Sequence, residues 1–175
     1  VVTFDRNPTA IVNPEKTPFS IASLNDNCRM IGSLGISLAV ILEFNATISR
    51  MSAQEFFDKI VIGKLRAAKI VVGHDFAFGN ARVGTPEWLS QRIETEIVEP
   101  FLVDGERVSS SVIRSKVQAG DVEGVAVLRG APFEIPGVVV KGQQLGRTIG
   151  FPTVNIARST NQITPKDGIY AGWAK

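Results

Sequence analysis

The sequence is poor in the residues that crosslink a chain, give it a strong charge of one sign or cross a membrane. It has one cysteine, Cys28, so an intramolecular disulfide is excluded and the chain fits a reducing cytosol. Lysine and arginine number 19 against 17 aspartate and glutamate, a net charge of +2 without a basic block, so a nucleic-acid partner is not expected. The apolar run 38–42 has the length of a strand and ends at Glu43. We therefore expect a cytoplasmic protein with no membrane partner.

The first part of the chain alternates between strand and helix patterns. Apolar residues make up 44% of the chain, which suffices for a folded core in one large or two small domains. We expect helices after Ser23 (with Leu24, Cys28 and Ile31 on one face), after the capping-box sequence at Ser52, and from Pro86. Strands are predicted at residues 1–4, 37–44, 69–73 and 97–103. Strand 37–44, the helix after Ser52 and strand 69–73 predict a βαβ unit and a parallel sheet.

The pattern changes after Gly120. Residues 121–128 predict a short helix, and closely spaced glycines and prolines then separate β-rich runs such as 138–140. Short strands between frequent turns are typical of an antiparallel barrel or sandwich. We place the boundary between Gly120 and Pro132, and divide the chain into domains 1–123 and 124–175.

A basic, glycine-rich turn near the C-terminal end has the chemistry of a phosphate site. It reads Gly146-Arg147-Thr148-Ile149-Gly150-Phe151-Pro152-Thr153-Val154-Asn155. Glycines let the backbone approach a phosphate, and Arg147 adds positive charge. Thr153 and Asn155 offer a hydroxyl and an amide oxygen, the hard ligands that a magnesium–nucleotide complex accepts. The alternative is a turn-rich barrel whose glycines serve backbone geometry alone.

A second candidate site follows the predicted strand 69–73. Loops at the carboxyl ends of parallel strands are where open α/β sheets bind ligands. Asp75, Phe76 and Phe78 could there stack on a flat ring and accept its hydrogen bonds. The alternative is that both phenylalanines belong to the core.

A third candidate site is the serine run that opens the helix after Arg107. Ser109, Ser110 or Ser111 caps this helix, whose free backbone amides favour an anion. Arg107 precedes the hydroxyls and Arg114 lies about one turn into the helix, so the two arginines could clamp a triphosphate. The alternative is an ordinary serine cap beside two solvated arginines.

These three motifs, in this order, resemble the bifunctional bacterial riboflavin kinase/FAD synthetase family. Gly-Arg-x-x-Gly-Phe-Pro-Thr-x-Asn resembles the riboflavin kinase signature, while Asp-Phe-x-Phe-Gly and Ser-Ser-x-x-x-Arg resemble the FAD synthetase half. The resemblance implies an α/β nucleotidyltransferase-like domain with a Rossmann-like parallel sheet, followed by part of an antiparallel Greek-key β-barrel. It also implies that riboflavin is phosphorylated to FMN and FMN is adenylylated to FAD, with ATP and Mg²⁺.

The resemblance assigns roles residue by residue. Catalytic roles in adenylyl transfer fall on Arg107, Ser110, Ser111 and Arg114. ATP or flavin binding falls on Asp75, Phe76, Phe78, Gly79, Ser109, Gly146, Arg147, Gly150, Phe151 and Pro152. Thr153 and Asn155 would hold Mg²⁺. The expected partners are flavins and ATP, and self-association is possible.

The chain also departs from the family pattern. The family has a Gly-x-His-x-Gly-His-type element whose histidines contact ATP phosphates, whereas this chain has one histidine, His74, at a variable position. Arg6 and Asn7 replace Pro-His in Thr-Phe-x-Pro-His-Pro, and Ala131 replaces an arginine. Both ends of the family pattern are missing, the kinase base included, so we expect this chain alone to be impaired in both reactions.

Two alternatives follow from these departures. The first is a degenerate, non-catalytic flavin- or nucleotide-binding protein of the same fold. The second is a nucleotidyltransferase for a phosphopantetheine-like or nicotinate substrate, which the Phe-Pro-Thr-x-Asn segment disfavours.

Overall fold

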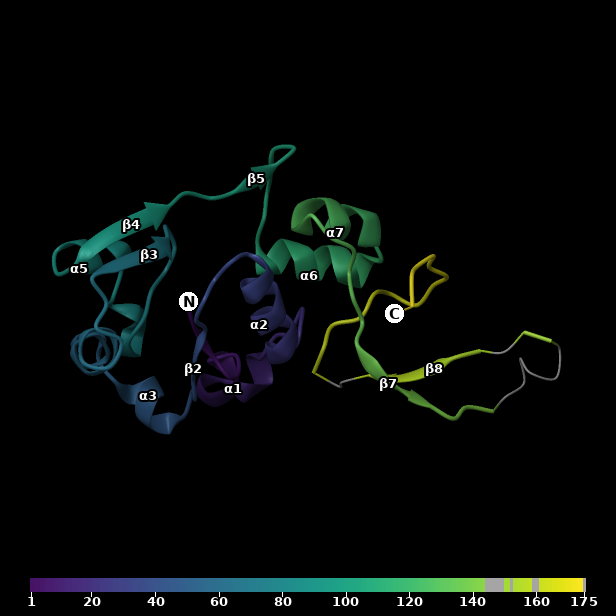
Figure 1. Ribbon diagram of the computed structural model, residues 1–175, viewed down its shortest axis with the longest axis horizontal. Coiled ribbons are helices and arrows are strands. Elements are labelled where there is room, and N and C mark those ends of the chain that lie inside the picture. The colour runs from purple at the N-terminus through teal and green to yellow at the C-terminus, as the bar shows by residue number, and fades with distance from the viewer. Residues whose placement is uncertain (144–149, 152, 159–160, 175) are drawn as a thin grey trace. The chain divides into compact units, whose positions relative to one another are not determined.

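The chain forms two compact units, shown in the computed structural model of Figure 1. The structure describes residues 1–143, 150–151, 153–158 and 161–174. The first unit comprises residues 1–18 and 24–107, and the second comprises residues 19–23 and 108–175. No helix in the described ranges is long and apolar enough to cross a membrane.

Two pairs of parallel strands build the first unit. Strand β1 (Val2–Phe4) pairs with β2 (Val40–Leu42), and β3 (Lys69–Gly73) pairs with β4 (Glu94–Val98). The predicted parallel pairing is confirmed, but the predicted βαβ unit from strand 37–44 to strand 69–73 is wrong, because β2 and β3 belong to different sheets. Alternating strands and helices dictate parallel pairs, whereas the choice of neighbour depends on packing between distant segments.

The strand predicted at residues 97–103 is divided by Pro100. Strand β4 already ends at Val98, and β5 (Leu102–Val103) pairs antiparallel with β6 (Glu106–Arg107). Proline has no N–H for a ladder and fixes its own φ, which accounts for the break. Asp104 and Gly105 form the turn of the hairpin with φ of 50° and 81°, the left-handed backbone that a two-residue Asp-Gly turn requires.

Three helices of the first unit begin where the sequence predicts, namely α2 (Leu24–Ser33), α4 (Ala53–Phe56) and α5 (Pro86–Ser90). The π-helical turn η2 (Phe57–Ile62) continues α4, and α1 (Thr9–Val12), η1 (Pro14–Lys16), α3 (Ala46–Arg50) and η3 (Asn80–Arg82) were not predicted. The capping box is confirmed, since Ser52 Oγ accepts the Glu55 N–H and Glu55 Oε2 accepts the Ser52 N–H, both at 3.1 Å. Thr85 Oγ1 accepts the Trp88 N–H at 3.3 Å, and Pro86 occupies the first helical position as predicted.

The core of the first unit lies beneath β3. Phe57, Val61 and Leu89 are buried, and Ile70, Val72, Phe78 and Trp88 are among the side chains packed against them. The predicted inner face of α2 is also confirmed, because Leu24, Cys28 and Ile31 are half-buried while Asn25, Asn27 and Arg29 are exposed. Ile70 and Val72 alternate with exposed residues along β3, so one face of the β3–β4 pair packs inward.

The second unit combines two helices with an antiparallel strand pair. Helix α6 (Ser110–Ala119) ends at Gly120, whose φ is 84°, and α7 (Val122–Arg129) begins with Asp121 accepting the Gly124 N–H at 2.8 Å. Val117 and Val125 are fully buried. Strand β7 (Gly137–Val140) pairs with β8 (Asn155–Arg158). The helix predicted at residues 121–128 is confirmed, and the β7–β8 pair is antiparallel as expected.

Candidate functional site

An ion pair marks the carboxyl end of β3. Arg107 Nη2 donates a 2.7 Å hydrogen bond to Asp75 Oδ2, which joins two exposed side chains 32 residues apart in the sequence. This bond is the main cause that holds the pKa of Asp75 below its ordinary value, so the carboxylate is charged at neutral pH. Sequence reasoning grouped Arg107 with the serines and missed this partner, because nothing in the local pattern signals a pair so far apart.

The two aromatic residues of the same loop differ in their packing. Phe78 packs edge-on against Trp88, with ring centroids 5.7 Å apart, and is one of the side chains around the core. Phe76 is 40% exposed and stacks on Phe78 with centroids 5.7 Å apart and an interplanar angle of 28°. The core interpretation therefore describes Phe78, whereas Phe76 presents an exposed ring beside Asp75 to which a flat ligand could bind.

Gly79 is required where the loop passes the start of α4. Its φ is 75°, and a Cβ added there would lie 2.5 Å from the Ala53 nitrogen. Asn80 N–H also donates to the Met51 carbonyl at 2.7 Å. These contacts fix the loop that carries Asp75 and Phe76 against the chain that leads into α4.

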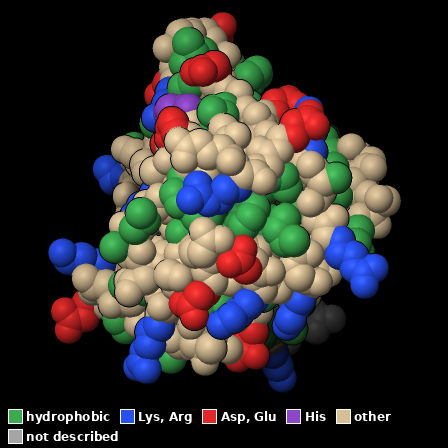
Figure 2. All heavy atoms as spheres, turned by 90° about the vertical axis from the view of Figure 1, so that its left-hand side faces the viewer, with side chains coloured by type: hydrophobic (Ala, Val, Ile, Leu, Met, Phe, Trp, Pro, Cys, Tyr) green, Lys and Arg blue, Asp and Glu red, His purple; other side chains and the backbone are tan. Residues whose placement is uncertain are grey.

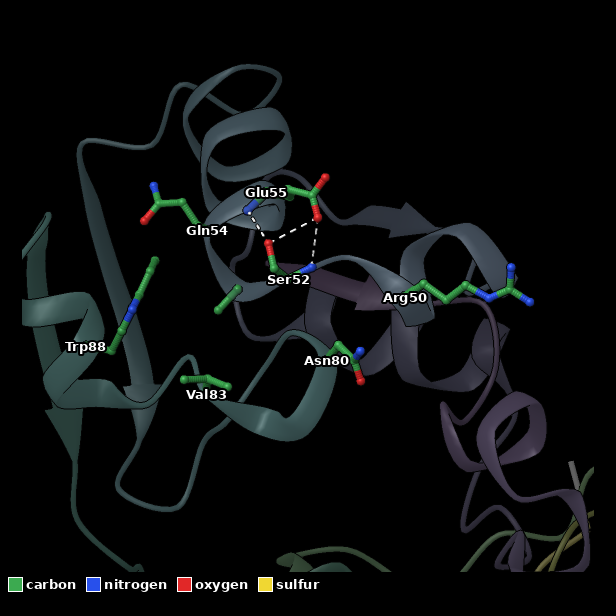
Figure 3. Close-up of a pocket in the computed structure, with 8 residues that line it drawn as sticks. Arg50, Ser52, Gln54, Glu55, Asn80, Val83 and Trp88 are labelled. Carbon is green, nitrogen blue, oxygen red and sulfur yellow. Dashed lines mark hydrogen bonds between the residues drawn. The ribbon is translucent and has the colours of Figure 1, made fainter.

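A pocket of about 380 Å³ lies next to this loop (Figure 3). It is lined by Arg50, Ser52, Ala53, Gln54, Glu55, Asn80, Val83 and Trp88. Ser52 and Glu55 are already bonded to each other in the capping box, and the Arg50 side chain extends away from Trp88. None of the eight residues was predicted as a site residue. The pocket lining thus has one aromatic side chain, two carboxamides and one hydroxyl group.

Charge is mixed on the surface that Figure 2 shows. Acidic and basic side chains alternate among hydrophobic ones, and the single histidine, His74, lies among charged side chains. No continuous field of one sign appears on this face.

Of the three serines at residues 109–111, one caps helix α6. Ser109 is the N-cap of α6, and its Oγ accepts the Val112 N–H at 3.3 Å. Ser110 and Ser111 are the first two residues of the helix, and both are exposed. Their hydroxyls are thus available to a ligand at the start of the helix.

The half-buried side chain of Arg114 is hydrogen-bonded to the backbone. Its Nε donates to the Phe19 carbonyl at 2.8 Å, and burial lowers the pKa of its guanidinium, which nevertheless stays charged. Arg107 lies in the first unit, and Ser109 through Arg114 lie in the second. The Arg114 guanidinium is therefore held from Nε by the backbone of residue 19 while the side chain remains partly exposed.

The glycine-rich turn is only partly described. Gly146, Arg147 and Pro152 lie outside the described residues. Gly150 has φ of 81° and Phe151 is 75% exposed.

The predicted magnesium ligands lie at the start of β8. Asn155 begins the strand opposite Val140, and a Cβ at Gly142 would collide with its carboxamide, so the amide lies directly against the Gly142 backbone. Thr153 and Asn155 are both exposed and two residues apart. In the part of the chain that the structure describes, no group of three or more His, Cys, Asp or Glu could hold a metal ion. Two neutral oxygens suit Mg²⁺, which commonly keeps waters and substrate phosphates as its other ligands.

Comparison with known proteins agrees with the three motifs and their order. The family model described as FAD synthetase matches residues 1–112, and that described as riboflavin kinase matches residues 129–175. The bifunctional riboflavin kinase/FMN adenylyltransferases of Bacillus subtilis and Pseudomonas fluorescens are 36% and 34% identical over 98% and 97% of this chain. The chain spans about half the length of these relatives, 55% and 56%.

A solved structure shows the same fold. A crystal structure described as a macrolide-efflux protein from Streptococcus pneumoniae matches with a TM-score of 0.85 and 31% identity, over 96% of this chain and 56% of that one.

Because the FAD synthetase model matches residues 1–112, the chain belongs to the FAD synthetase family, and the riboflavin kinase match follows the synthetase match along the chain. The family resemblance of the sequence is confirmed.

Proposed function

We propose that this chain takes part in flavin cofactor synthesis. Residues 1–123 form an FMN adenylyltransferase domain, and residues 124–175 contribute to a riboflavin kinase domain that is part of a Greek-key barrel. The observation that carries the proposal is the pair of family matches in this order, with the Asp75–Arg107 ion pair at the ligand-binding edge of a parallel strand pair.

In adenylyl transfer an oxygen of the FMN phosphate attacks the α-phosphorus of ATP, and pyrophosphate leaves. Arg107 and Arg114 neutralise the charge that develops on the phosphates, and Ser110 and Ser111 donate hydrogen bonds to them. Ser109 fixes the start of the helix that presents those hydroxyls. The anchoring of Arg114 by the Phe19 carbonyl supports this role, because a preorganised cation stabilises developing charge without reorganising first.

The flavin is held by the loop after β3. Asp75 accepts hydrogen bonds from the polar edge of the ring system, Phe76 stacks on its face, and Phe78 supports Phe76 from below. Gly79 lets the loop pass α4. The stacked pair Phe76–Phe78 supports this assignment, since it leaves one aromatic ring exposed next to a charged carboxylate.

In riboflavin phosphorylation the glycine-rich turn holds the substrates. Gly146, Arg147 and Gly150 bind phosphate, Phe151 and Pro152 shape the flavin site, and Thr153 and Asn155 would hold Mg²⁺. When bound, the ion neutralises and orients the transferring phosphate. The two exposed oxygens at the start of β8 support this placement.

ATP binding tests the proposal. Equilibrium dialysis of labelled ATP with the 175-residue chain should show saturable binding, and Arg107→Gln should weaken it about tenfold because a charge-assisted contact is lost. Arg29→Gln, which removes an exposed arginine paired with Asp26 on α2, is the matched control. An absence of saturable ATP binding to the folded wild-type chain would refute the proposal.

Turnover by the chain alone is a separate matter. The family's histidine element has no counterpart around the chain's one histidine. We therefore expect the chain to bind ATP and FMN but to convert them to FAD only slowly. Chromatography of flavins after incubation with FMN, ATP and Mg²⁺ measures this. Rapid FAD formation would contradict the expected impairment while leaving the family function intact.

A further inference from the structure

A second aspartate–arginine pair lies at the end of β1. Arg6 donates to Asp5 Oδ2 from Nε at 2.8 Å and from Nη2 at 2.6 Å. Successive side chains of an extended strand point to opposite sides, but β1 ends at Phe4 and the chain bends at residues 5 and 6. The bend allows neighbouring side chains to meet, so Arg6 is held by its own predecessor.

Asp5 itself is fixed to the neighbouring strand. Its Oδ1 accepts the Phe44 N–H at 2.8 Å, and its backbone N–H donates to the Leu42 carbonyl at 3.0 Å. These bonds tie the end of β1 to the end of β2. The Asp5–Arg6 pair therefore lies where two parallel strands finish together, at the edge where open α/β sheets bind ligands.

The arginine keeps most of its donors for another group. A guanidinium has five N–H donors, and the two bonds to Asp5 come from Nε and Nη2. Within the described part of the chain Nη1 has no acceptor, and the side chain is 50% exposed. The open edge of such a fork matches two oxygens of a phosphate.

Stability does not account for this arrangement. An exposed ion pair between two side chains contributes little to the free energy of folding. Asp5 accepts a backbone N–H from Phe44, whereas Arg6 bonds no backbone group among the residues that the structure describes. The next residue is used locally, since Asn7 Oδ1 accepts the Thr9 N–H at 2.9 Å and closes the following turn.

The same arrangement recurs in this unit at β3. There Asp75 follows the strand and accepts a single hydrogen bond from Arg107 Nη2. Both parallel pairs of the first unit thus end in an aspartate that fixes an exposed arginine.

We propose that Arg6 is a phosphate-binding residue of the adenylyltransferase domain, held in position by Asp5 at the carboxyl end of β1. This proposal rests on the proposed function. The ligand is a phosphate group, either the monoester of FMN or the triphosphate of ATP. Arg6 stands where the family pattern has proline, so the contact is particular to this chain.

The test compares ligands with and without the relevant phosphate. Affinities for FMN, riboflavin and ATP are measured by titration for the wild-type chain, Arg6→Gln, Arg6→Lys and the control Arg29→Gln. Arg6→Gln should lower the affinity for either FMN or ATP by about tenfold or more, because a charge-assisted contact to the phosphate is lost. Arg6→Lys should retain part of the affinity, since it keeps the charge but not the fork.

The pattern of losses identifies the phosphate. Weaker FMN binding with unchanged riboflavin binding assigns Arg6 to the flavin phosphate, and weaker ATP binding alone assigns it to the nucleotide. Wild-type affinity of Arg6→Gln for both FMN and ATP would overturn the inference, as would an equal loss for FMN and riboflavin. If the wild-type chain binds neither FMN nor ATP, the proposed function fails and the inference fails with it.

Discussion

Single side chains set the charge of the proposed site, and Asp75 is the clearest case. The hydrogen bond from Arg107 lowers the pKa of Asp75. The pKa of Asp5 is lowered in the same way, mainly by the hydrogen bond from Arg6 and to a smaller extent by that from the Phe44 N–H. A carboxylate with a lowered folded-state pKa stabilises the fold above its unfolded pKa, and loses that contribution as pH falls through the folded value. Both carboxylates are therefore charged at neutral pH, and the ion pairs open only when the pH falls below the ordinary titration range of an aspartate.

The Asp75–Arg107 ion pair can be tested by titrating Asp75. In Arg107→Gln the midpoint of Asp75, followed by carbon NMR of its carboxyl group, should move up towards the ordinary value because the largest cause of its shift is gone. Asp121 is the internal control, since its pKa is lowered chiefly by the Gly124 N–H and then by Lys116. An unchanged Asp75 midpoint would show that Arg107 is not its partner in solution.

Gly79 and Gly105 allow the energetic cost of a steric collision to be measured separately from the cost of a left-handed backbone conformation. Both have positive φ, but a Cβ at Gly79 would meet the Ala53 backbone, whereas nothing lies within 4 Å of one at Gly105. Gly105→Ala should cost about 1 kcal/mol of unfolding free energy for its conformation alone. Gly79→Ala should cost about 2–4 kcal/mol, because collision is added to conformation. Equal losses in urea unfolding would contradict the close approach.

At the scale of elements, the sequence predicted what neighbouring residues determine. The capping box at Ser52, Pro86 at the start of α5, the strand at 69–73 and the inner face of α2 all depend on spacing within a few residues. The pairing of β2 was predicted wrongly, because strand order depends on contacts between distant segments. The β5–β6 hairpin was missed although Asp104-Gly105 is a strong hairpin signal.

The contribution of the α4 cap to the free energy of unfolding can be measured. Ser52→Ala removes the acceptor for the Glu55 N–H and should lower the unfolding free energy by about 1 kcal/mol. Ser49→Ala is the control, because the Ser49 hydroxyl bonds the Ala46 carbonyl within α3 and caps no free N–H. Similar losses for the two variants would mean that the capping box does not stabilise this helix.

For the whole molecule, composition and motif order predicted two parts with different chemistry. No pattern in the sequence predicts that residues 19–23 join the second unit. There Ser20 N–H donates to Asn161 at 2.8 Å, and Gln162 Nε2, on a buried side chain, donates to the carbonyls of Ile21 and Glu134 at 3.2 Å. Such contacts connect segments up to 141 residues apart, and no local pattern encodes them.

Flavin binding tests the central claim most directly. Titration of the 175-residue chain into FMN, followed by flavin fluorescence, should show saturable binding of one FMN at the Asp75 loop, and Phe76→Ala should weaken it about tenfold through loss of ring stacking. Leu34→Ala, at a side chain that is 80% exposed on the same unit, should leave it unchanged. No saturable change in fluorescence with the folded wild-type chain, or full affinity in Phe76→Ala, would contradict the assignment of this loop to flavin.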